Sequence, residues 1–375
     1  MNVNADFDLA IVGGGIVGAA CASACSKRGL KVILIERNVL GSGATAAGMG
    51  HIVVMDDSEA QFALTRYSQF LWQKLAPQLS PCAEYERRGT LWIAADREEM
   101  EAAERKQSWY AARSVPCRLL TARELVDAEP NLAAGLEGAL LVSDDAVVYP
   151  PHVAMELAMQ AQSLGAVLLI GKAVRNIADG IVELEDGTLI RAQRIVNALG
   201  AESAHLSPQL PIRKRKGHLV ITDRYQGFVN HQLVELGYIK SAHNLGGDSV
   251  AFNVQPRKTG QLLVGSSRQF GAEHNQVDQA ILTAMLQRAA LYLPGLSALS
   301  AIRIWTGFRA ATPDKLPLIG PDLQNPSLLL ATGHEGLGIT TSLATAELIA
   351  DQLTGSVSKI PVEPYLPSRF LQPTR

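Results

Sequence analysis

The sequence predicts an α/β fold built around a doubly wound, mainly parallel sheet. Two features of the 375-residue chain lead to this prediction. Near the amino terminus, a buried strand runs through a glycine-rich turn into a helix and then into a second buried strand. Near the carboxyl terminus, another apolar strand runs through a glycine-rich loop into a helix. Strands that alternate with helices in this way are typical of parallel sheets. The chain is long enough for two domains.

The opening glycines follow the first strand directly, in the stretch LAIVGGGIVG. Residues 9–12 are an apolar run typical of a buried parallel strand, and Gly13, Gly15 and Gly18 then have the spacing GxGxxG. The first glycine permits a tight turn, the second lets a pyrophosphate approach the backbone, and the third lets the next helix pack closely on the strand. This order of strand, glycines and helix predicts dinucleotide binding.

The helix after the glycines is expected over residues 16–28, because this segment is rich in alanine and Gly29 follows as a natural C-cap. Its amino terminus offers backbone NH groups to a phosphate. The second strand, KVILIE, ends in Glu36, at a position where a carboxylate accepts hydrogen bonds from ribose hydroxyls. This acid favours a cofactor with a free 2′-hydroxyl, although the adjacent Arg37 weakens the argument against NADP.

A helix and a strand are expected in the later stretch YPPHVAMELAMQAQSLGAVLLIGKAVRNI. A hairpin should follow, because Asp186 and Gly187 lie between alternating apolar residues. Residues 195–200 then have the pattern of a buried strand that ends in glycine.

The carboxyl-terminal glycine loop, in LLLATGHEGLGITTSLATAELIADQL, precedes a helix expected from about Ile339. The amino terminus of this helix can stabilise negative charge on a reduced flavin ring. The two glycine loops lie at opposite ends of the chain, as expected if one long cofactor is held at its pyrophosphate and again at its redox ring. The small residues of GSGATAAGMGH, over 41–51, suit contact with a large planar ligand. These features favour FAD over NAD.

The composition argues against several classes of function. A formal net charge of −2 gives no basic excess of the kind that nucleic acid binding needs. No signal peptide and no apolar run of roughly 20 residues is visible, so we expect a cytoplasmic protein without a membrane span. The four cysteines form no CxxC pair, and Cys21 and Cys25 lie one turn apart in the expected helix. No metal site is therefore expected.

A series of motifs runs along the chain in the order GGGIVG, Glu36 with Arg37, TAAGM, the strand before Val174, NALGA, WTGFR with PDKLPLIG, and GHEGLGIT. This order of motifs resembles that of the D-amino acid oxidase family of flavoproteins. The resemblance covers nearly the whole chain and is strongest to the branch of glycine oxidase, D-amino acid dehydrogenase and hydrogen cyanide synthase. It implies that FAD binds across a Rossmann-type domain into which a mostly antiparallel α+β substrate domain is inserted. The expected FAD-binding domain comprises residues 1–80, 142–205 and 303–375, and the expected substrate domain comprises 81–141 and 206–302. The cofactor-binding positions that the resemblance implies are Gly13, Gly15, Gly18, Glu36, Arg37, Thr45, Gly48, Met49, Val174, Gly200, Gly333, Gly336, Leu337, Gly338 and Ile339.

The same resemblance implies the chemistry. In this family an amine loses a hydride from its α-carbon to flavin N5, and water hydrolyses the resulting imine. The protein mainly holds the substrate carboxylate and orients the carbon. Arg309, in GFRAATP, matches the arginine that pairs with that carboxylate, although a structural salt bridge would also explain it. Asn253 lies where glycine oxidase has a tyrosine, and Gly336 lies where it has an arginine, so a wider and less basic pocket for a larger or cyclic amino acid is expected.

His51 is the third candidate catalytic residue, because it follows TAAGM and should lie near the flavin ring, although a loop histidine can also be merely solvated. His334 and Glu335 fit either loop packing or substrate contact, and Tyr238 is a weaker candidate in the substrate region. No cysteine follows Cys117, which excludes FAD attachment to a cysteine in the last third of the chain but not attachment to a histidine.

The electron acceptor is not visible in the sequence. The chain resembles the FAD subunit of hetero-oligomeric dehydrogenases, so we expect partner subunits with further redox groups, or contact with an electron carrier or the membrane periphery. D-hydroxyproline is the preferred substrate. The alternatives are an oxidase that uses oxygen, an opine dehydrogenase subunit, a flavin-binding subunit without catalysis, and an NAD-dependent dehydrogenase, against which the carboxyl-terminal glycine loop argues.

Overall fold

The expected cofactor motifs lie on a mainly parallel sheet. The computed structural model describes residues 7–237 and 247–371. Five strands pair in parallel, in the order β18 (Leu328–Thr332), β11 (Leu189–Asn197), β1 (Phe7–Val12), β2 (Val32–Glu36) and β8 (Val167–Ile170). An antiparallel strand, β17 (Leu318–Pro321), pairs with β18 at the edge. The two strands predicted from the opening stretch are thus central neighbours, and the predicted fold class is confirmed.

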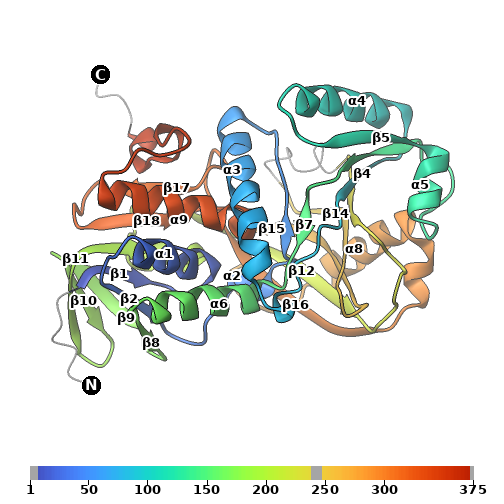
Figure 1. Cartoon of the computed structure of the whole chain (residues 1–375). Helices are drawn as coiled ribbons and strands as arrows, with labels where there is room; N and C mark the ends of the chain where they lie inside the picture. The colour runs from blue at the N-terminus through green and yellow to red at the C-terminus, as the bar shows by residue number, and fades with distance from the viewer. Residues whose placement is uncertain (1–6, 238–246, 372–375) are drawn as a thin grey trace.

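Helices cover one face of this sheet, as Figure 1 shows. Their bounds are α1 (Ile16–Lys27), α6 (Pro150–Ser163) and α9 (Gly338–Thr354), with α3 (Glu59–Leu75) packed on α9. α1 is buried on nearly all sides because its residues are small, and its thiols Cys21 and Cys25 are buried and unbridged. The apolar residues of these helices and of the sheet form one continuous core.

A β-meander covers the opposite face of the sheet. It consists of β9 (Val174–Ala178), β10 (Ile181–Leu184) and the first part of β11, which pair antiparallel. Gly187, with φ of +84°, forms the predicted turn between β10 and β11. Val182 and Leu184 pack with Ile33 and Ile35 in a second core.

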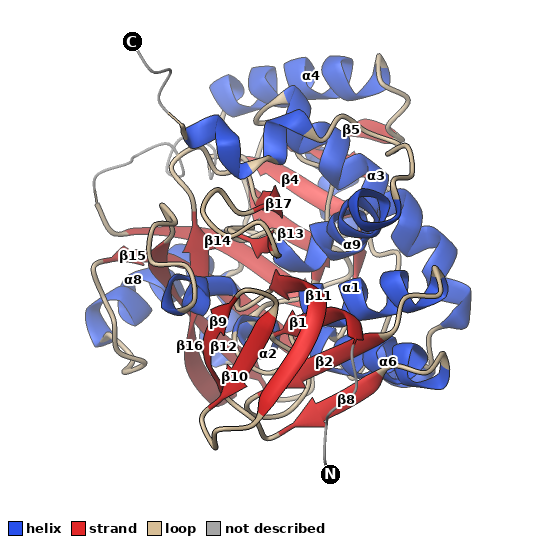
Figure 2. Ribbon diagram, turned by 90° about the vertical axis from the view of Figure 1, so that its left-hand side faces the viewer, coloured by secondary structure: helices blue, strands red, loops and turns tan. Residues whose placement is uncertain are grey.

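A second sheet of eight strands forms the other half of the molecule (Figure 2). Its order is β16 (Ala301–Ala311), β12 (Arg213–Thr222), β15 (Leu262–Phe270), β14 (Ser249–Pro256), β13 (Gln232–Glu235), β4 (Thr90–Ala94), β6 (Gly138–Val142) and β5 (Cys117–Thr121). Only β13 and β4 pair in parallel. α8 (Gln279–Tyr292) covers one face, where the ring of Phe252 stacks on that of Tyr292 with centroids 4.6 Å apart. α4 (Arg97–Ala111) and α5 (Ala122–Ala128) pack near β5 and β6.

The opposite face of the second sheet meets segments that follow the first βαβ unit. These segments are α2 (Ala44–Ala47) and β3 (His51–Ile52), which pairs with β7 (Ala146–Val147). A Cβ added at Gly307 would lie 2.3 Å from the Cβ of Ala47, so β16 and α2 are in close contact. Gln255 Nε2 also donates a hydrogen bond of 2.8 Å to the carbonyl oxygen of Met49.

The strand β16 contains one expected domain boundary. The sequence predicts that residues from 303 onward belong to the cofactor domain, and residue 303 lies inside β16. β16 pairs antiparallel with β12 from Arg213–Ala311 to Thr222–Ala301, so it belongs to the second sheet. Long-range pairing decides this, because the local sequence of a strand does not identify its partner.

Among residues 7–237 and 247–371, no helix is long and apolar enough to cross a membrane.

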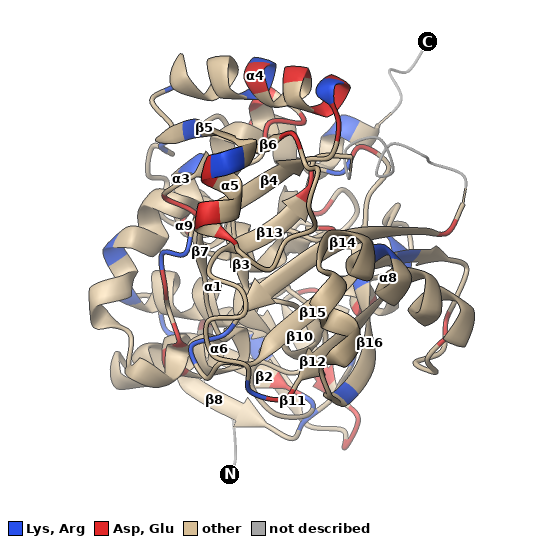
Figure 3. Cartoon of the chain, turned by 90° about the vertical axis from the view of Figure 1, so that its right-hand side faces the viewer, with Lys and Arg blue, Asp and Glu red and all other residues tan. Residues whose placement is uncertain are grey.

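The outer helix α4 carries both acidic and basic residues (Figure 3).

Candidate active site

The turn between β1 and α1 has no space for side chains. A Cβ added at Gly18 would lie 1.9 Å from the carbonyl oxygen of Gly13, and one at Gly13 would lie 2.7 Å from that of Ala198. Gly13 also has φ of +109°, which side chains disfavour. Within the described part of the chain, the amide hydrogens of Gly15 and Val17 have no acceptor. A bare turn with amides open at a helix amino terminus fits the pyrophosphate of FAD.

Glu36 lies buried at the end of β2, beside this turn. Its Oε2 accepts a hydrogen bond of 2.7 Å from the Gly14 amide, and its Oε1 accepts one of 2.8 Å from the Asn38 amide. Each carboxylate oxygen has two lone pairs, so both retain a position for a ribose hydroxyl. Arg37 is exposed directly after it.

Thr45, in α2, closes the other side of the turn. Its Oγ1 accepts a hydrogen bond of 3.0 Å from the amide of Ile16, and Ile16 is the first residue of α1. A Cβ added at Gly15 would lie 3.2 Å from the same oxygen. The α2 segment is therefore fixed against the predicted phosphate site.

Three other predicted cofactor positions follow strands of the first sheet. Val174 begins β9 shortly after β8, Gly200 follows β11, and Gly333 follows β18. The carboxyl ends of parallel strands meet at one edge, and here Val12 of β1 is level with Asn197 of β11. The structure therefore gathers these positions along the edge that also carries Gly13 and Glu36.

The loop before α9 meets the segment after α2. A Cβ added at Gly48 would lie 2.7 Å from Cδ1 of Ile339, so these two predicted flavin-binding segments are in contact. Met49 follows Gly48, and its Sδ would lie 3.4 Å from a Cβ added at Gly265 of β15. The remaining predicted residues of this loop are Gly336, Leu337 and Gly338, at the start of α9. The helix amino terminus thus faces the junction of the two sheets.

Arg309 lies on β16 between two glycines that come from other segments. A Cβ added at Gly217 would lie 2.6 Å from its Nη1, and one at Gly336 would lie 3.5 Å from its Nε. Nη1 donates a hydrogen bond of 2.9 Å to the carbonyl oxygen of Ser267. The guanidinium is therefore held in one place, beside the amino-terminal loop of α9, where it can pair with a carboxylate.

Asn253 lies on β14 in contact with a second amide side chain. Gln232 Nε2 donates a hydrogen bond to Oδ1 of Asn253. Oε1 of Gln232 is buried and has no partner among the described residues. Because a buried acceptor without a partner is costly, this amide pair is suited to bind a polar group of a ligand.

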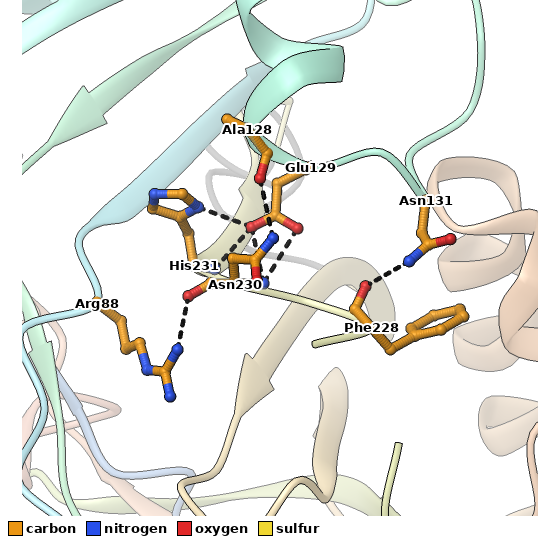
Figure 4. Close-up of polar contacts among 7 residues, drawn as sticks. All are labelled: Arg88, Ala128, Glu129, Asn131, Phe228, Asn230 and His231. Carbon is orange, nitrogen blue, oxygen red and sulfur yellow. Dashed lines mark hydrogen bonds and ion pairs between the residues drawn. The ribbon is translucent and has the colours of Figure 1, made fainter. Parts of the chain in front are cut away.

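Glu129, directly after α5, forms hydrogen bonds with the residues before β13 (Figure 4). Its buried carboxylate accepts hydrogen bonds from the Asn230 amide at 2.9 Å, from the His231 amide at 2.7 Å and from Nδ1 of His231 at 2.7 Å. The Arg88 guanidinium donates to the Asn230 carbonyl oxygen at 3.4 Å. These bonds hold the residues that directly precede Gln232.

His51, on β3, connects both halves of the site. Its carbonyl oxygen accepts a hydrogen bond of 2.8 Å from Thr340 Oγ1 of α9, and its Nε2 lies 2.8 Å from Thr90 Oγ1 of β4. Thr90 is level with Gln232 in the second sheet. Burial lowers the pKa of His51 to about 3, so its imidazole is neutral near pH 7.

The two other loop candidates have different surroundings. His334 is buried, with Nε2 3.0 Å from Thr345 Oγ1 of α9, and burial lowers its pKa to about 4. Glu335 forms an ion pair with Arg215 of β12, while its amide donates to the Ala310 carbonyl oxygen at 2.9 Å. Tyr238 lies outside the described residues. No group of three His, Cys, Asp or Glu side chains within the described ranges is arranged to hold a metal ion.

Sequence reasoning missed three polar residues of this site, namely Thr90, Gln232 and Gln255. Each lies on a strand of the second sheet, and each contacts a predicted residue or its neighbour. No motif marks them, since only the pairing of strands brings them to the site.

The chain matches a known family and several known proteins over most of its length. The model of the FAD dependent oxidoreductase family (DAO) matches residues 8–352. Glycine oxidase from Geobacillus kaustophilus is 28% identical over 380 residues, with 97% of each chain covered. Hydrogen cyanide synthase subunit HcnC from Pseudomonas aeruginosa is 25% identical, with 98% of this chain and 97% of that protein covered. The crystal structure of L-proline dehydrogenase from P. horikoshii matches with a TM-score of 0.88 at 26% identity, with 97% of this chain and 98% of that chain covered. The chain therefore belongs to the FAD dependent oxidoreductase family, and it is an FAD-dependent enzyme whose relatives include amino acid oxidases and dehydrogenases.

Proposed function

We propose that this enzyme oxidises the carbon–nitrogen bond of a D- or secondary amino acid to an imine, with D-hydroxyproline as the preferred substrate. When bound, FAD supplies the acceptor for the hydride, N5 of its ring. The chain binds the substrate carboxylate, orients the α-carbon and excludes water.

The observation that carries this proposal is the position of Arg309. Its guanidinium lies between Gly217 and Gly336, so the main chain on both sides leaves space that a side chain would otherwise fill. The Ser267 carbonyl oxygen holds Nη1 in position, which reduces the entropy lost when a carboxylate binds. A planar guanidinium held in this way favours a substrate with a carboxylate, such as an amino acid.

The amide pair of Gln232 and Asn253 supports a polar, cyclic substrate. Asn253 is smaller than the tyrosine of glycine oxidase, and Gly336 has no side chain, so the predicted pocket is wider than one for glycine. The buried and unpartnered Oε1 of Gln232 can accept a hydrogen bond from a substrate hydroxyl. Similarity to L-proline dehydrogenase is consistent with a secondary amine in a ring.

We further propose that the enzyme works as a dehydrogenase subunit that passes electrons to a partner. A relative that matches 98% of this chain is named as a subunit of hydrogen cyanide synthase, which supports assembly with other chains. Turnover of the isolated chain with oxygen would favour the alternative, an amino acid oxidase. Reduction by opines alone would favour an opine dehydrogenase.

Anaerobic titration of the purified holoenzyme tests the substrate class. The panel comprises D-amino acids, glycine, sarcosine, the isomers of proline and hydroxyproline, and opines. We expect D-hydroxyproline to bleach the flavin absorbance band at the lowest concentration. If no compound bleaches it, the isolated chain is not a complete amino acid dehydrogenase and the proposal is refuted for this form of the protein.

Arg309→Ala and Arg309→Lys test the role of the guanidinium in the same assay. Loss of two charge-assisted hydrogen bonds should weaken substrate binding at least about 10²-fold in the alanine variant, and lysine should restore it only partly. Arg303→Ala is the matched control, because Arg303 lies exposed on the same strand. An Arg309→Ala variant that is reduced like the control would favour a flavin-binding subunit without catalysis.

The acceptor is tested by mixing the reduced enzyme with oxygen or with a quinone analogue. We expect slow reoxidation by oxygen and fast reoxidation by the quinone analogue. The reverse order would contradict a dehydrogenase.

A further inference from the structure

The ring of His51 contacts a buried threonine, and a buried carboxylate that no cofactor or substrate role explains lies next to that threonine. Nε2 of His51 lies 2.8 Å from Oγ1 of Thr90. Thr90 is fully buried on β4, and the amide of the preceding residue, Gly89, donates a hydrogen bond of 3.0 Å to the carbonyl oxygen of Asp145. Thr90 and Asp145 are therefore held side by side by the backbone.

The carboxylate of Asp145 is fully buried and only half satisfied. Its Oδ1 accepts hydrogen bonds from Gln69 Nε2 at 2.9 Å and from the Val54 amide at 3.3 Å. Its Oδ2 is buried and has no partner of ordinary hydrogen-bond geometry among the described residues. Since Oδ1 already accepts two hydrogen bonds, Oδ2 is the oxygen available to Thr90.

The charges around Asp145 allow it to exist in either protonation state. Burial raises its pKa to about 7, against the opposite effects of the Thr90 hydroxyl, the Val54 amide and Lys106 of α4. Asp144 raises it further. The phenol of Tyr110, on α4, donates a hydrogen bond of 2.8 Å to the Val54 carbonyl oxygen, and burial raises its pKa, as do Asp56 and Asp145.

We propose that Asp145 is a positioning residue for His51. The carboxylate accepts the hydrogen of the Thr90 hydroxyl, Thr90 accepts the hydrogen on Nε2 of His51, and Nδ1 is left as the acceptor of the ring. We expect Nδ1 to accept a hydrogen bond from an N–H of the bound amino acid, and this expectation rests on the proposed function. The predicted tautomer of His51 is independent of the proposed function.

The reverse arrangement follows when Asp145 takes up a proton. Its Oδ2–H then donates to Thr90, the Thr90 hydroxyl donates to Nε2, and the hydrogen of the imidazole moves to Nδ1. No net charge appears on His51, because its pKa of about 3 is far below the pKa of about 7 of Asp145. The ring would thereby change from an acceptor to a donor toward the substrate as the pH falls.

The tautomer can be measured in the holoenzyme without any substrate, by long-range ¹H–¹⁵N correlation on protein labelled at its eight histidines. The His51→Gln variant assigns the signals. In the wild-type protein we expect the Nε2–H tautomer at pH 8.5 and a shift toward Nδ1–H at pH 5.5. An Nδ1–H tautomer at pH 8.5 would overturn the proposal.

Two variants separate the proposed connection from a general effect on the fold. In Asp145→Asn, the amide nitrogen replaces Oδ2 and donates to Thr90, so we expect the Nδ1–H tautomer at both pH values. Asp144→Asn is the matched control, because Asp144 is the charged neighbour of Asp145 but takes no part in the proposed hydrogen bonds. In this variant His51 should keep the Nε2–H tautomer at pH 8.5. If both variants match the wild type at pH 8.5, the proposal is wrong.

A second pair of variants decides the matter if Asp145→Asn does not fold. Thr90→Ser keeps the hydroxyl and should keep the wild-type response to pH. Thr90→Val keeps the shape and should abolish that response, so a retained response in this variant would also overturn the proposal. A flavin that no amino acid bleaches would refute the proposed function and leave the tautomer result unaffected.

Discussion

Replacing Gly217 by alanine tests whether the position of the Arg309 guanidinium controls substrate binding. The new Cβ would lie 2.6 Å from Nη1 and 3.1 Å from Cζ of Arg309. Ordinary contact requires about 3.4 Å, so the guanidinium has to move by roughly 0.8 Å. That movement also strains its bond to the Ser267 carbonyl oxygen, which is 2.9 Å long.

The expected result is a loss of substrate binding in a folded protein. A misplacement of about 1 Å in a positioning group costs roughly 10²-fold, so the substrate concentration needed to bleach the flavin should rise by about this factor. The fold should survive because the clash involves the end of a flexible side chain, and alanine in a strand is favoured over glycine by about 0.5–1 kcal/mol. FAD content and melting temperature should therefore stay close to those of the wild type.

The assay is the anaerobic flavin titration, with thermal unfolding measured on the same samples. Gly247→Ala is the control, because a Cβ added there meets no atom within 4 Å. Unchanged titration in Gly217→Ala would refute the reasoning. So would a loss of FAD, since it would place the effect in the fold.

Three other predictions concern the cofactor turn and the two histidines His51 and His334. In Gly18→Ala, the Cβ would lie 1.9 Å from the carbonyl oxygen of Gly13. The oxygen belongs to the backbone and the Cβ is fixed to it, so neither can move aside alone. We expect loss of bound FAD and destabilisation of about 3 kcal/mol, measured by flavin content and urea unfolding. Glu36→Ala removes the predicted acceptor of the ribose hydroxyls, so the FAD dissociation constant should rise about 10- to 100-fold in a fluorescence titration, and an unchanged constant would contradict that role. Burial lowers the pKa of His51 to about 3 and that of His334 to about 4, below their ordinary value of 6.5. As the pH falls, these histidines therefore take up protons in the unfolded chain before they do so in the folded protein. The free energy of unfolding should then decrease as the pH falls from about 6.5 to 4. His334→Gln should make this fall shallower in urea denaturation, and an equally steep fall would show that His334 does not contribute.

Features that depend on local spacing were predictable from the sequence. The GxGxxG turn, the helix after it and the acid at the end of β2 follow from residues within one βαβ unit, since glycine spacing and apolar runs act over a few residues. The glycine loop before α9 and the hairpin at Gly187 were predictable for the same reason. These elements predict the fold class and one half of the candidate cofactor site.

The second half of the candidate site depends on strand pairings between distant segments of the chain. β16 belongs to the second sheet because it pairs with β12, and that register places Arg309 beside Gly217. Gln232 and Thr90 reach the site through the parallel pairing of β13 with β4. Such pairings join residues far apart in the chain, and their register depends on the packing of whole sheet faces, so no short motif records them. For this reason the sequence named Arg309, Asn253 and His51 only through a family resemblance, while their polar partners came from the fold.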